Sequence, residues 1–344
     1  MNISKSLLTI HFCIISFGIN AQHLHTPQEV EQYMKKSTIQ YQMDSLSVEL
    51  EAVFFPLIEK GSFLEKTKNG VQIRKKEFLL HKKSKRFYKK AEKAISKNKL
   101  EKAIKYYTKA IEAQPDQLQL INEFANFYWE NGDMENVVFW ARKGIELNPV
   151  DFEAHARLAL ALQNLGKKTE ALEHIILAHL YNRNHPKIIE IMPSIFKENG
   201  LNYQDYIFQP EYKIEKLASN QVSIQANLEP WKSYAACKAL WQNEENYRTE
   251  MSYLSKKDIT SIEQKECLLN ALIGYGKMGK GKEKFSIFDI LEKSLQYRMI
   301  DDFIFYEIKL RQDPTLIYFL PKEKKDRIVR YLKTIRVGKE VTPE

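Results

Sequence analysis

Cysteine is scarce in this chain, which has three in 344 residues. Cys13 falls within a leader-like segment, so the rest of the chain has Cys237 and Cys267. Two cysteines cannot build a small disulfide-based fold, which needs several bridges. Both lie in apolar sequence that favours helix, which predicts buried free thiols. The alternative is one disulfide bond between these two cysteines, which an oxidising compartment would permit.

The usual sequence signals of catalysis and metal binding are also missing. The chain has no zinc-protease pattern, no serine in a nucleophile elbow and no cysteine with an evident histidine partner. His174 and His179 are spaced i, i+5, so on a helix they point about 140° from each other and cannot hold one metal. His23 and His25 follow the leader-like segment, where a surface role is expected. The sequence therefore predicts no catalytic residue, no metal site and no cofactor.

Long apolar runs are absent after Ala21. Lys5 precedes a mostly apolar run, Leu7–Ile19, and Ala21 offers a small residue for cleavage. The run is too short for a membrane-spanning helix, which needs about 20 apolar residues. We therefore expect residues 1–21 to be a signal peptide and the mature chain to be periplasmic or envelope-associated, without a transmembrane helix. An uncleaved anchor is the alternative.

One glycine-rich stretch, residues 274–281, has nearly the spacing of a phosphate-binding loop. Such loops wrap a phosphate with backbone N–H groups after a strand and before a helix. Here the preceding residues, Ile262–Ile273, favour a helix, and Gly281 stands where a magnesium-binding hydroxyl is needed. The stretch is better interpreted as the end of a helix followed by a basic loop.

Positive charge is concentrated in one part of the chain, whose net charge is +9. Residues 66–109 contain 17 Lys or Arg against three Glu. On a helix, four of these lysines would form one stripe: Lys82, Lys85, Lys89 and Lys93. This stripe is a candidate site for anions such as lipid head groups, and a solvated end face is the alternative. Nucleic acid is not expected, because an exported protein rarely meets it.

A regular repeat period runs through the middle of the chain. Small residues recur at this period in three columns, and proline closes two of the units: Ala91, Ala125 and Ala159; Ala103, Val137 and Ala171; Ala110, Gly144 and Ala178; Pro115 and Pro149. Helix–turn–helix repeats that stack into a solenoid have such a period, about 34 residues. Small residues let two helices approach closely, and proline ends the second helix.

These columns resemble the tetratricopeptide repeat family, with Tyr107 and Ile175 at its apolar position. The match covers about residues 84–186, with Arg183 where a third proline is expected. The pattern does not continue for another period in either direction. Leu57 or Pro193 would then occupy the small-residue position of Ala91, Ala125 and Ala159. The resemblance therefore implies three repeats that serve as a noncovalent docking surface.

In this family, the first helix of each repeat lines a concave groove. The resemblance places seven candidate partner-binding residues there: Lys85, Tyr88, Asn122, Asn126, Trp129, Glu153 and Gln163. Asn122 and Asn126 are expected to hydrogen-bond an extended peptide backbone. Tyr88 and Trp129 are expected to give apolar anchors, with packing between helices as the alternative. Tyr88 and Glu92 replace a lysine and an asparagine of the chaperone-tail clamp, so that specific activity is not expected.

The sequence around the repeats predicts further elements. A helix is expected from Thr26 to Phe55, a hairpin within residues 61–75, and a capping helix at 187–198 interrupted by Pro193. Residues 212–215 and 222–225 alternate apolar with polar residues, which predicts two short strands. After Pro230, a helix buried on most sides is expected to contain Trp231 to Trp241. Further helices are expected at about 244–255, 260–275, 284–298, 300–311 and 321–336.

The predicted fold is an all-α helical repeat solenoid with a short β-containing junction and a second helical half. The expected ranges are 1–21, signal peptide; 22–83, helix and basic connector; 84–200, three repeats and a capping helix; 201–228, junction; and 229–344, helical domain. The predicted function is an exported scaffold, not an enzyme, that binds a peptide or protein partner. The alternatives are an enzyme with its site in the C-terminal half and a basic protein that contacts anionic membrane surfaces peripherally.

Overall fold

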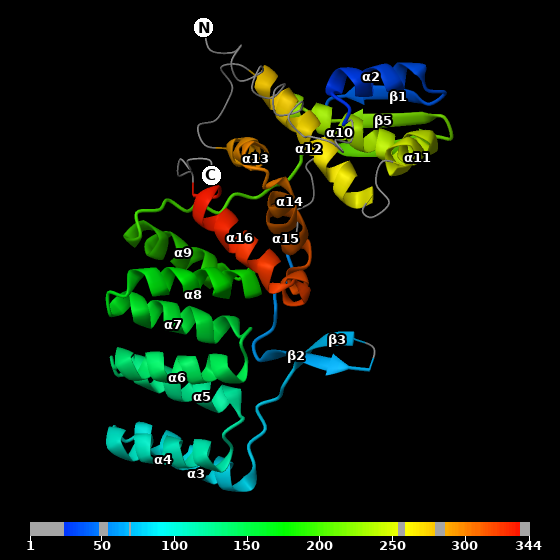
Figure 1. Cartoon of the computed structure of the whole chain (residues 1–344). Coiled ribbons are helices and arrows are strands. Elements are labelled where there is room, and N and C mark those ends of the chain that lie inside the picture. The colour runs from blue at the N-terminus through cyan, green and yellow to red at the C-terminus, as the bar shows by residue number, and fades with distance from the viewer. Residues whose placement is uncertain (1–23, 48–53, 69, 254–258, 279–285, 338–344) are drawn as a thin grey trace. The chain divides into compact units, whose positions relative to one another are not determined.

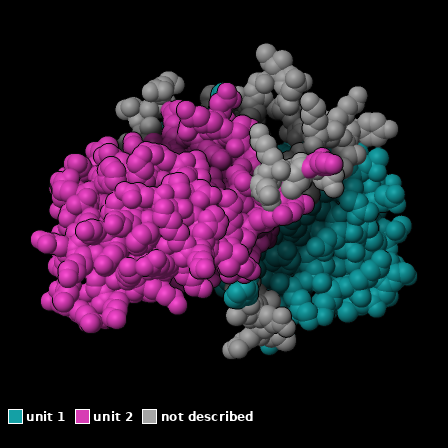
Figure 2. Space-filling view, turned by 90° about the horizontal axis from the view of Figure 1, so that it is seen from below, with its two compact units in different colours: residues 1–54, 206–308, 340–344 teal, residues 55–205, 309–339 magenta. Residues whose placement is uncertain are grey.

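The computed structural model describes residues 24–47, 54–68, 70–253, 259–278 and 286–337. The expected signal peptide lies outside these ranges. The chain forms two compact units, coloured separately in Figure 2. We call them the sheet unit (Met1–Phe54, Tyr206–Ile308 and Glu340–Glu344) and the array unit (Phe55–Asp205 and Lys309–Lys339). Both are assembled from segments far apart in the chain, unlike the consecutive ranges expected from the sequence.

Three helix pairs form the centre of the array unit (Figure 1). They are α3 (Lys82–Ile95) with α4 (Leu100–Ala113), α5 (Leu118–Glu130) with α6 (Met134–Leu147), and α7 (Phe152–Asn164) with α8 (Lys168–Tyr181). α5 also packs on α4, and α7 on α6, so the pairs stack in chain order. The three predicted repeats are confirmed.

The small-residue columns lie where the helices are closest. Ala91, Ala125 and Ala159 are all 0% exposed. At Gly144, an added Cβ would lie 3.3 Å from Asn122 Oδ1 and 3.4 Å from the Cβ of Ala154. A larger side chain in these columns would therefore push neighbouring helices apart.

A fourth column extends the repeat beyond the three pairs. The turn residues Asn98, Gly132, Gly166 and Gly200 recur at the same period, and all have φ between 50° and 75°. Glycine reaches this left-handed conformation without the steric cost that a Cβ imposes. The last of these turns follows α9 (Pro186–Glu198), which packs on α8. α9 thus has the place of the first helix of an incomplete fourth repeat.

The expected interruption of α9 at Pro193 is wrong, because the helix continues through this residue. Pro193 lies on the exposed side of α9. There, water can reach the backbone carbonyl that loses its helical partner.

Residues 55–81 run along one edge of the array before α3 begins, and we call them the strap. The strap contains the predicted hairpin, formed by β2 (Ser62–Thr67) and β3 (Gly70–Lys75) with Ser62 opposite Lys75. The backbone N–H of Lys76 donates to the carbonyl of Gly61 and closes the base of the hairpin. The hairpin is therefore confirmed from the pairing of its two strands. Asn69 lies outside the described residues.

The C-terminal part of the chain returns to the array. It consists of α15 (Leu310–Gln312), a 3₁₀ helix η3 (Pro314–Phe319) and α16 (Lys322–Thr334). Both η3 and α16 contact α8, and the hydroxyl of Tyr318 donates to the carbonyl of Tyr181 at 3.0 Å. The last complete repeat is thus covered by α9 and by the C-terminal segment.

A three-stranded sheet organises the sheet unit, with the order β1–β5–β4. β1 (Gln40–Asp44) is parallel to β5 (Gln221–Gln225), and β4 (Lys213–Ala218) is antiparallel to β5. The two strands predicted in the junction are confirmed, as is the predicted fold class. The helix expected from Thr26 to Phe55 is wrong: α2 (Pro27–Lys36) ends early and β1 follows. The pairing partner of β1 lies far along the chain, so no local pattern reveals it.

Five helices complete the described part of the unit. They are α10 (Glu229–Asn243), α11 (Glu245–Tyr253), α12 (Ile259–Lys277), α13 (Ile287–Gln296) and α14 (Ile300–Phe303), with a π-helical turn η2 (Ile304–Lys309). α10 packs on the sheet through β4 and β5, and it also packs on α2 and α12. A core cluster forms at this contact: Val222, Ile224, Ala235 and Ala239.

Gly274 belongs to α12, which contradicts the strand-first geometry that a phosphate-binding loop needs. A Cβ at Gly274 would lie 2.7 Å from the carbonyl oxygen of Glu229. The glycine therefore allows α12 to approach α10 closely. The last three residues of the stretch, Gly279 to Gly281, lie outside the described residues.

A buried carboxylate, Glu266, joins the N-terminal segment to α12. Trp241 Nε1 and the Tyr247 hydroxyl donate to its Oε2 at 2.6 and 2.8 Å, and the backbone N–H of His25 donates to its Oε1 at 2.7 Å. The side chain of His25 also lies 2.9 Å from Oε1, and this hydrogen bond raises the pKa of His25. The expected surface role of His25 is therefore wrong. Nearby, Cys237 and Cys267 are free and buried, with their sulfur atoms 2.8 Å apart.

Candidate binding surfaces of the helical array

The candidate groove residue Asn122 lies inside the array. It is 2% exposed. Its amide donates to Asp151 Oδ2 at 3.1 Å, and its carbonyl oxygen accepts from Arg157 Nη1 at 3.4 Å. Asp151 in turn caps α7 by accepting from the backbone N–H of Glu153. Asn122 therefore holds α5 to the start of α7 and does not present an amide to a partner.

Asn126 and Trp129 lie farther along the same face of α5. Both are half-buried, and Asn126 Oδ1 accepts from Arg157 Nε at 2.9 Å. Burial lowers the pKa of Arg157, although nearby carboxylates favour its charged form. Asn126 keeps its amide N–H groups, which can donate to a peptide carbonyl. These residues are the part of the predicted groove whose polar groups suit an extended backbone.

Three other groove candidates, Glu153, Gln163 and Tyr88, already have partners within the array unit. Glu153 Oε2 lies 3.5 Å from Lys60 Nζ of the strap, and Gln163 Nε2 donates to Glu198 Oε1 at 2.5 Å. The ring of Tyr88 packs edge-on against Phe78 of the strap, with ring centroids 5.6 Å apart. Burial, and then the negative charge of Glu92, raises the pKa of Tyr88 to about 12. Packing, the alternative interpretation of Tyr88, thus accounts for much of its environment.

A row of buried amides at the edge of the array was missed by the sequence analysis. Gln114, Asn148 and Asn182 recur at the repeat period, and they form the C-caps of α4, α6 and α8. They are 7%, 3% and 0% exposed. We call these three residues the amide ladder. The amide ladder has the same period as the small-residue columns. The sequence signal for it was an amide residue directly before Pro115 and Pro149.

Each member of the ladder binds the backbone of the strap. Asn182 donates to the carbonyl of Ile58 at 3.0 Å and accepts from its N–H at 3.1 Å. Asn148 donates to the carbonyl of Ser62 at 3.0 Å. Gln114 donates to the carbonyl of Leu79 at 3.0 Å and accepts from the N–H of His81 at 2.8 Å. The strap therefore runs past the repeats from the third to the first.

Comparison with known proteins identifies the first helix pair of the array. Residues 84–117 match the family model described as tetratricopeptide repeat. This pair is a tetratricopeptide repeat (TPR). The next two pairs repeat its arrangement and stack on it in order, so we call the whole the TPR array. No curated protein matches the chain.

Solved structures resemble the chain at low identity. The first TPR of Spaghetti (RPAP3), bound to an HSP90 peptide, is 20% identical and has a TM-score of 0.32 over 36% of this chain and 99% of its own. The N-terminal domain of STI-1 from C. elegans is 19% identical and has a TM-score of 0.31; the match covers 33% of this chain and 93% of that domain. The MamA protein is 13% identical and has a TM-score of 0.33; the match covers 59% of this chain and 98% of MamA.

The predicted lysine stripe lies at the first helix of the TPR array. Lys82, Lys85, Lys89 and Lys93 are all exposed, while Ala91 faces the interior. Within the described residues, none of the four forms an ion pair with a carboxylate. Anion binding by this stripe, and partner contact by Lys85, stay predictions.

Two histidines form a buried pair between the helices of the third TPR. The Nδ1 atoms of His155 and His174 are 3.0 Å apart, and His155 Nε2 lies 3.0 Å from the carbonyl oxygen of Pro149. A carbonyl can only accept, so Nε2 of His155 carries the proton and His174 Nδ1 donates to His155 Nδ1. Burial lowers the pKa of His155 to about 4. The pair is therefore neutral at pH 7.

This pair predicts a loss of stability in mild acid. The unfolded chain binds a proton at His155 near pH 6.5, whereas the folded chain binds it only near pH 4. Its stabilising contribution is therefore full above pH 6.5 and is lost as the pH falls. The free energy of unfolding should depend on pH less steeply in His155→Gln than in the wild type, by roughly 1 kcal/mol between pH 8 and pH 6. Urea unfolding at the two pH values measures this difference, and equal slopes would contradict it.

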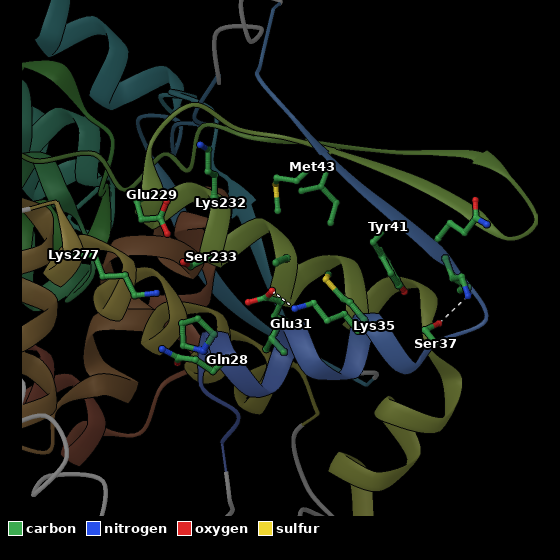
Figure 3. A pocket seen from close by; sticks show the side chains of 17 residues that line it. Gln28, Glu31, Lys35, Ser37, Tyr41, Met43, Glu229, Lys232, Ser233 and Lys277 are labelled. Carbon is green, nitrogen blue, oxygen red and sulfur yellow. Dashed lines mark hydrogen bonds and ion pairs between the residues drawn. The ribbon is translucent and has the colours of Figure 1, made fainter.

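The sheet unit has a cavity of its own, shown in Figure 3. It measures about 690 Å³ and lies beside α2, β1 and α10. Apolar residues such as Met34 and Ile224 line part of it, and charged residues such as Lys232 and Glu229 line the rest. Among the residues that the structure describes, none that lines this cavity is a histidine or cysteine.

The described residues of both units contain no cluster of three or more His, Cys, Asp or Glu side chains suited to a metal ion. No helix among these residues has both the length and the apolar character needed to cross a membrane.

Proposed function

We propose that this protein is a noncovalent scaffold whose TPR array holds an extended segment of a peptide or protein partner. One observation carries the proposal. The array already holds an extended segment of its own chain, through side chains that recur once per repeat. Repeats that offer the same group at a fixed spacing suit an extended backbone, whose polar groups also recur regularly.

The inner face of α5 and α7 supplies the partner surface in this proposal. The amide of Asn126 is placed to donate to a peptide carbonyl, and the half-buried Trp129 offers an apolar contact. Arg157 fixes the orientation of Asn126 through the 2.9 Å hydrogen bond. A site held in position by its neighbours loses less conformational freedom when a partner binds.

Noncovalent binding is favoured over an enzymatic role. The cavity of the sheet unit contains an ion pair between Lys35 and Glu31 at 2.6 Å on its rim. The hydroxyl groups of Ser37 and Tyr41 in its described lining both donate to the carboxylate of Glu244, so these polar groups join the N-terminal segment to the end of α10. We place the scaffold in the cell envelope, because residues 1–21 have the features of a signal peptide. Fractionation of cells that express the chain with and without these residues tests this location.

Site-specific photo-crosslinking in intact cells tests the partner surface. A photoreactive amino acid replaces Trp129 in one variant and Phe139, which is 51% exposed on α6, in a control variant. We expect a discrete crosslinked product from position 129 and at least a fivefold weaker one from position 139. Adding Asn126→Ala should weaken the product from position 129. Equal products from both positions, unaffected by that change, would remove the inner face from the account.

A further inference from the structure

The strap is held to the TPR array mainly through its backbone. All five hydrogen bonds of the amide ladder go to backbone N–H or carbonyl groups of residues 58–81. Asn184 extends the row, since its amide donates to the carbonyl of Pro56 at 2.9 Å. Recognition of this kind depends on an extended backbone more than on particular side chains.

The strap also contacts residues predicted for the groove. Lys60 pairs with Glu153 at 3.5 Å, and Phe78 packs on Tyr88. Between these contacts, Gln119 Nε2 donates to the carbonyl of Lys76 at 3.3 Å. Gln119 and Glu153 are again one repeat period apart, so a second repeated column faces the strap. The strap thus covers one side of the surface proposed for the partner.

We propose that the amide ladder is a binding site for extended polypeptide backbone and that residues 55–81 are its resident, exchangeable ligand. When the strap leaves, Glu153 and Tyr88 become available to a partner in the groove. This second effect rests on the proposed function, whereas the exchange itself does not.

The tether explains why the strap occupies the site at rest. A segment joined to its site by a short chain has an effective concentration on the order of millimolar. A free peptide at micromolar concentration therefore cannot displace it by mass action alone. When the strap leaves, water replaces its backbone at the ladder amides. The emptied site then offers the same donors and acceptors to another extended chain.

The exchange is testable with the full-length protein. In a strap variant, Ile58→Pro removes the N–H that Asn182 accepts. Gly61→Val adds a side chain to a residue with φ +75°, whose Cβ would lie 2.7 Å from Gln119 Nε2. The probe is a fluorescein-labelled synthetic peptide of residues 55–81, and its binding is followed by anisotropy. Limited proteolysis within residues 55–81 reports whether the strap is released, and circular dichroism reports whether the helices persist.

We expect the strap variant to bind the probe at least 20-fold more tightly than the wild type. Adding Gln114→Ala, Asn148→Ala and Asn182→Ala to the strap variant should abolish that gain. A probe with N-methyl groups at the amides of Ile58 and His81 should bind about tenfold more weakly, because it lacks the two N–H donors. Gly61→Val alone serves as a milder variant if the double change unfolds the array.

Three results would overturn the exchange. In the first, the strap is released but the probe does not bind. In the second, the probe binds and the three ladder substitutions do not weaken its binding. The third is loss of helical structure in both strap variants, which would make the strap an integral element and not a ligand. Crosslinking from position 129 separates this proposal from the proposed function. Probe exchange without any partner crosslink would leave the ladder site standing and reject the groove, and the reverse pattern would do the opposite.

Discussion

Replacing Asp205 by asparagine is expected to lower the free energy of unfolding of the array unit by about 3–5 kcal/mol, the usual cost of breaking a buried ion pair. Three buried arginines converge on this carboxylate. Arg311 Nη2 lies 2.7 Å from both its oxygens, Arg183 Nη1 lies 3.1 Å from Oδ1, and Arg336 Nη2 lies 3.8 Å from Oδ1. Asparagine keeps the shape but removes the charge that balances these guanidinium groups.

The position of this cluster explains the size of the effect. Arg183 follows α8, whereas Arg311 and Arg336 belong to the C-terminal segment that covers the last repeat. Asp205 therefore fastens the end of the array to that segment. A matched control is Glu173→Gln, which removes an exposed carboxylate 3.7 Å from Lys333. Exposed pairs contribute about 0–1 kcal/mol, so urea unfolding should separate the two variants clearly, and similar losses would contradict the assignment.

The same cluster has a defined dependence on acid. Burial alone would raise the pKa of Asp205, but Arg183 and Arg311 outweigh it and hold the pKa well below its ordinary value of 3.8. The contribution of Asp205 is therefore present above pH 3.8 and is lost as the pH falls below that value. The wild type should lose stability in this range, and Asp205→Asn should lose less.

Replacing Asn182 by alanine is expected to cost about 2–3 kcal/mol, because the change leaves the buried N–H and carbonyl of Ile58 without their partner. Each unsatisfied buried group costs about 1–3 kcal/mol. Its control is Asn164→Ala, which removes an exposed amide that donates to the carbonyl of Leu160 within its own helix. That control should change the free energy of unfolding by less than about 0.5 kcal/mol.

Urea unfolding followed by circular dichroism measures both asparagine variants. A further readout concerns the strap, since Asn182→Ala should also make residues 55–61 easier to cleave by protease. An Asn182→Ala protein as stable and as resistant as Asn164→Ala would show that the ladder does not hold the strap.

The repeats could be predicted from the sequence because their packing is local and periodic. Ala91, Ala125 and Ala159 report the same helix contact three times, and the structure buries all of them. The ladder at Gln114, Asn148 and Asn182 has the same period and could have been found by the same comparison. Its ligand could not, because Asn182 and Ile58 are 124 residues apart.

Other features depended on contacts that a local pattern does not contain. Residues 40–44 form a strand because they pair with residues 221–225, and without that partner the apolar spacing resembles a helix. Asn122 occupies a position that faces ligands in the family, but Asp151 and Arg157 use its amide here. Arg183 broke the proline column, and the structure gives the reason: its side chain binds Asp205.

Hydrogen–deuterium exchange of the wild type and of the triple ladder variant, Gln114→Ala with Asn148→Ala and Asn182→Ala, tests the central claim most directly. That claim is that the repeats hold an extended chain through once-per-repeat amides. The amides of Ile58 and His81 should be protected in the wild type and should exchange at least tenfold faster in the variant, while the helices of residues 118–181 stay protected. Equal protection of Ile58 and His81 in both proteins would contradict the claim.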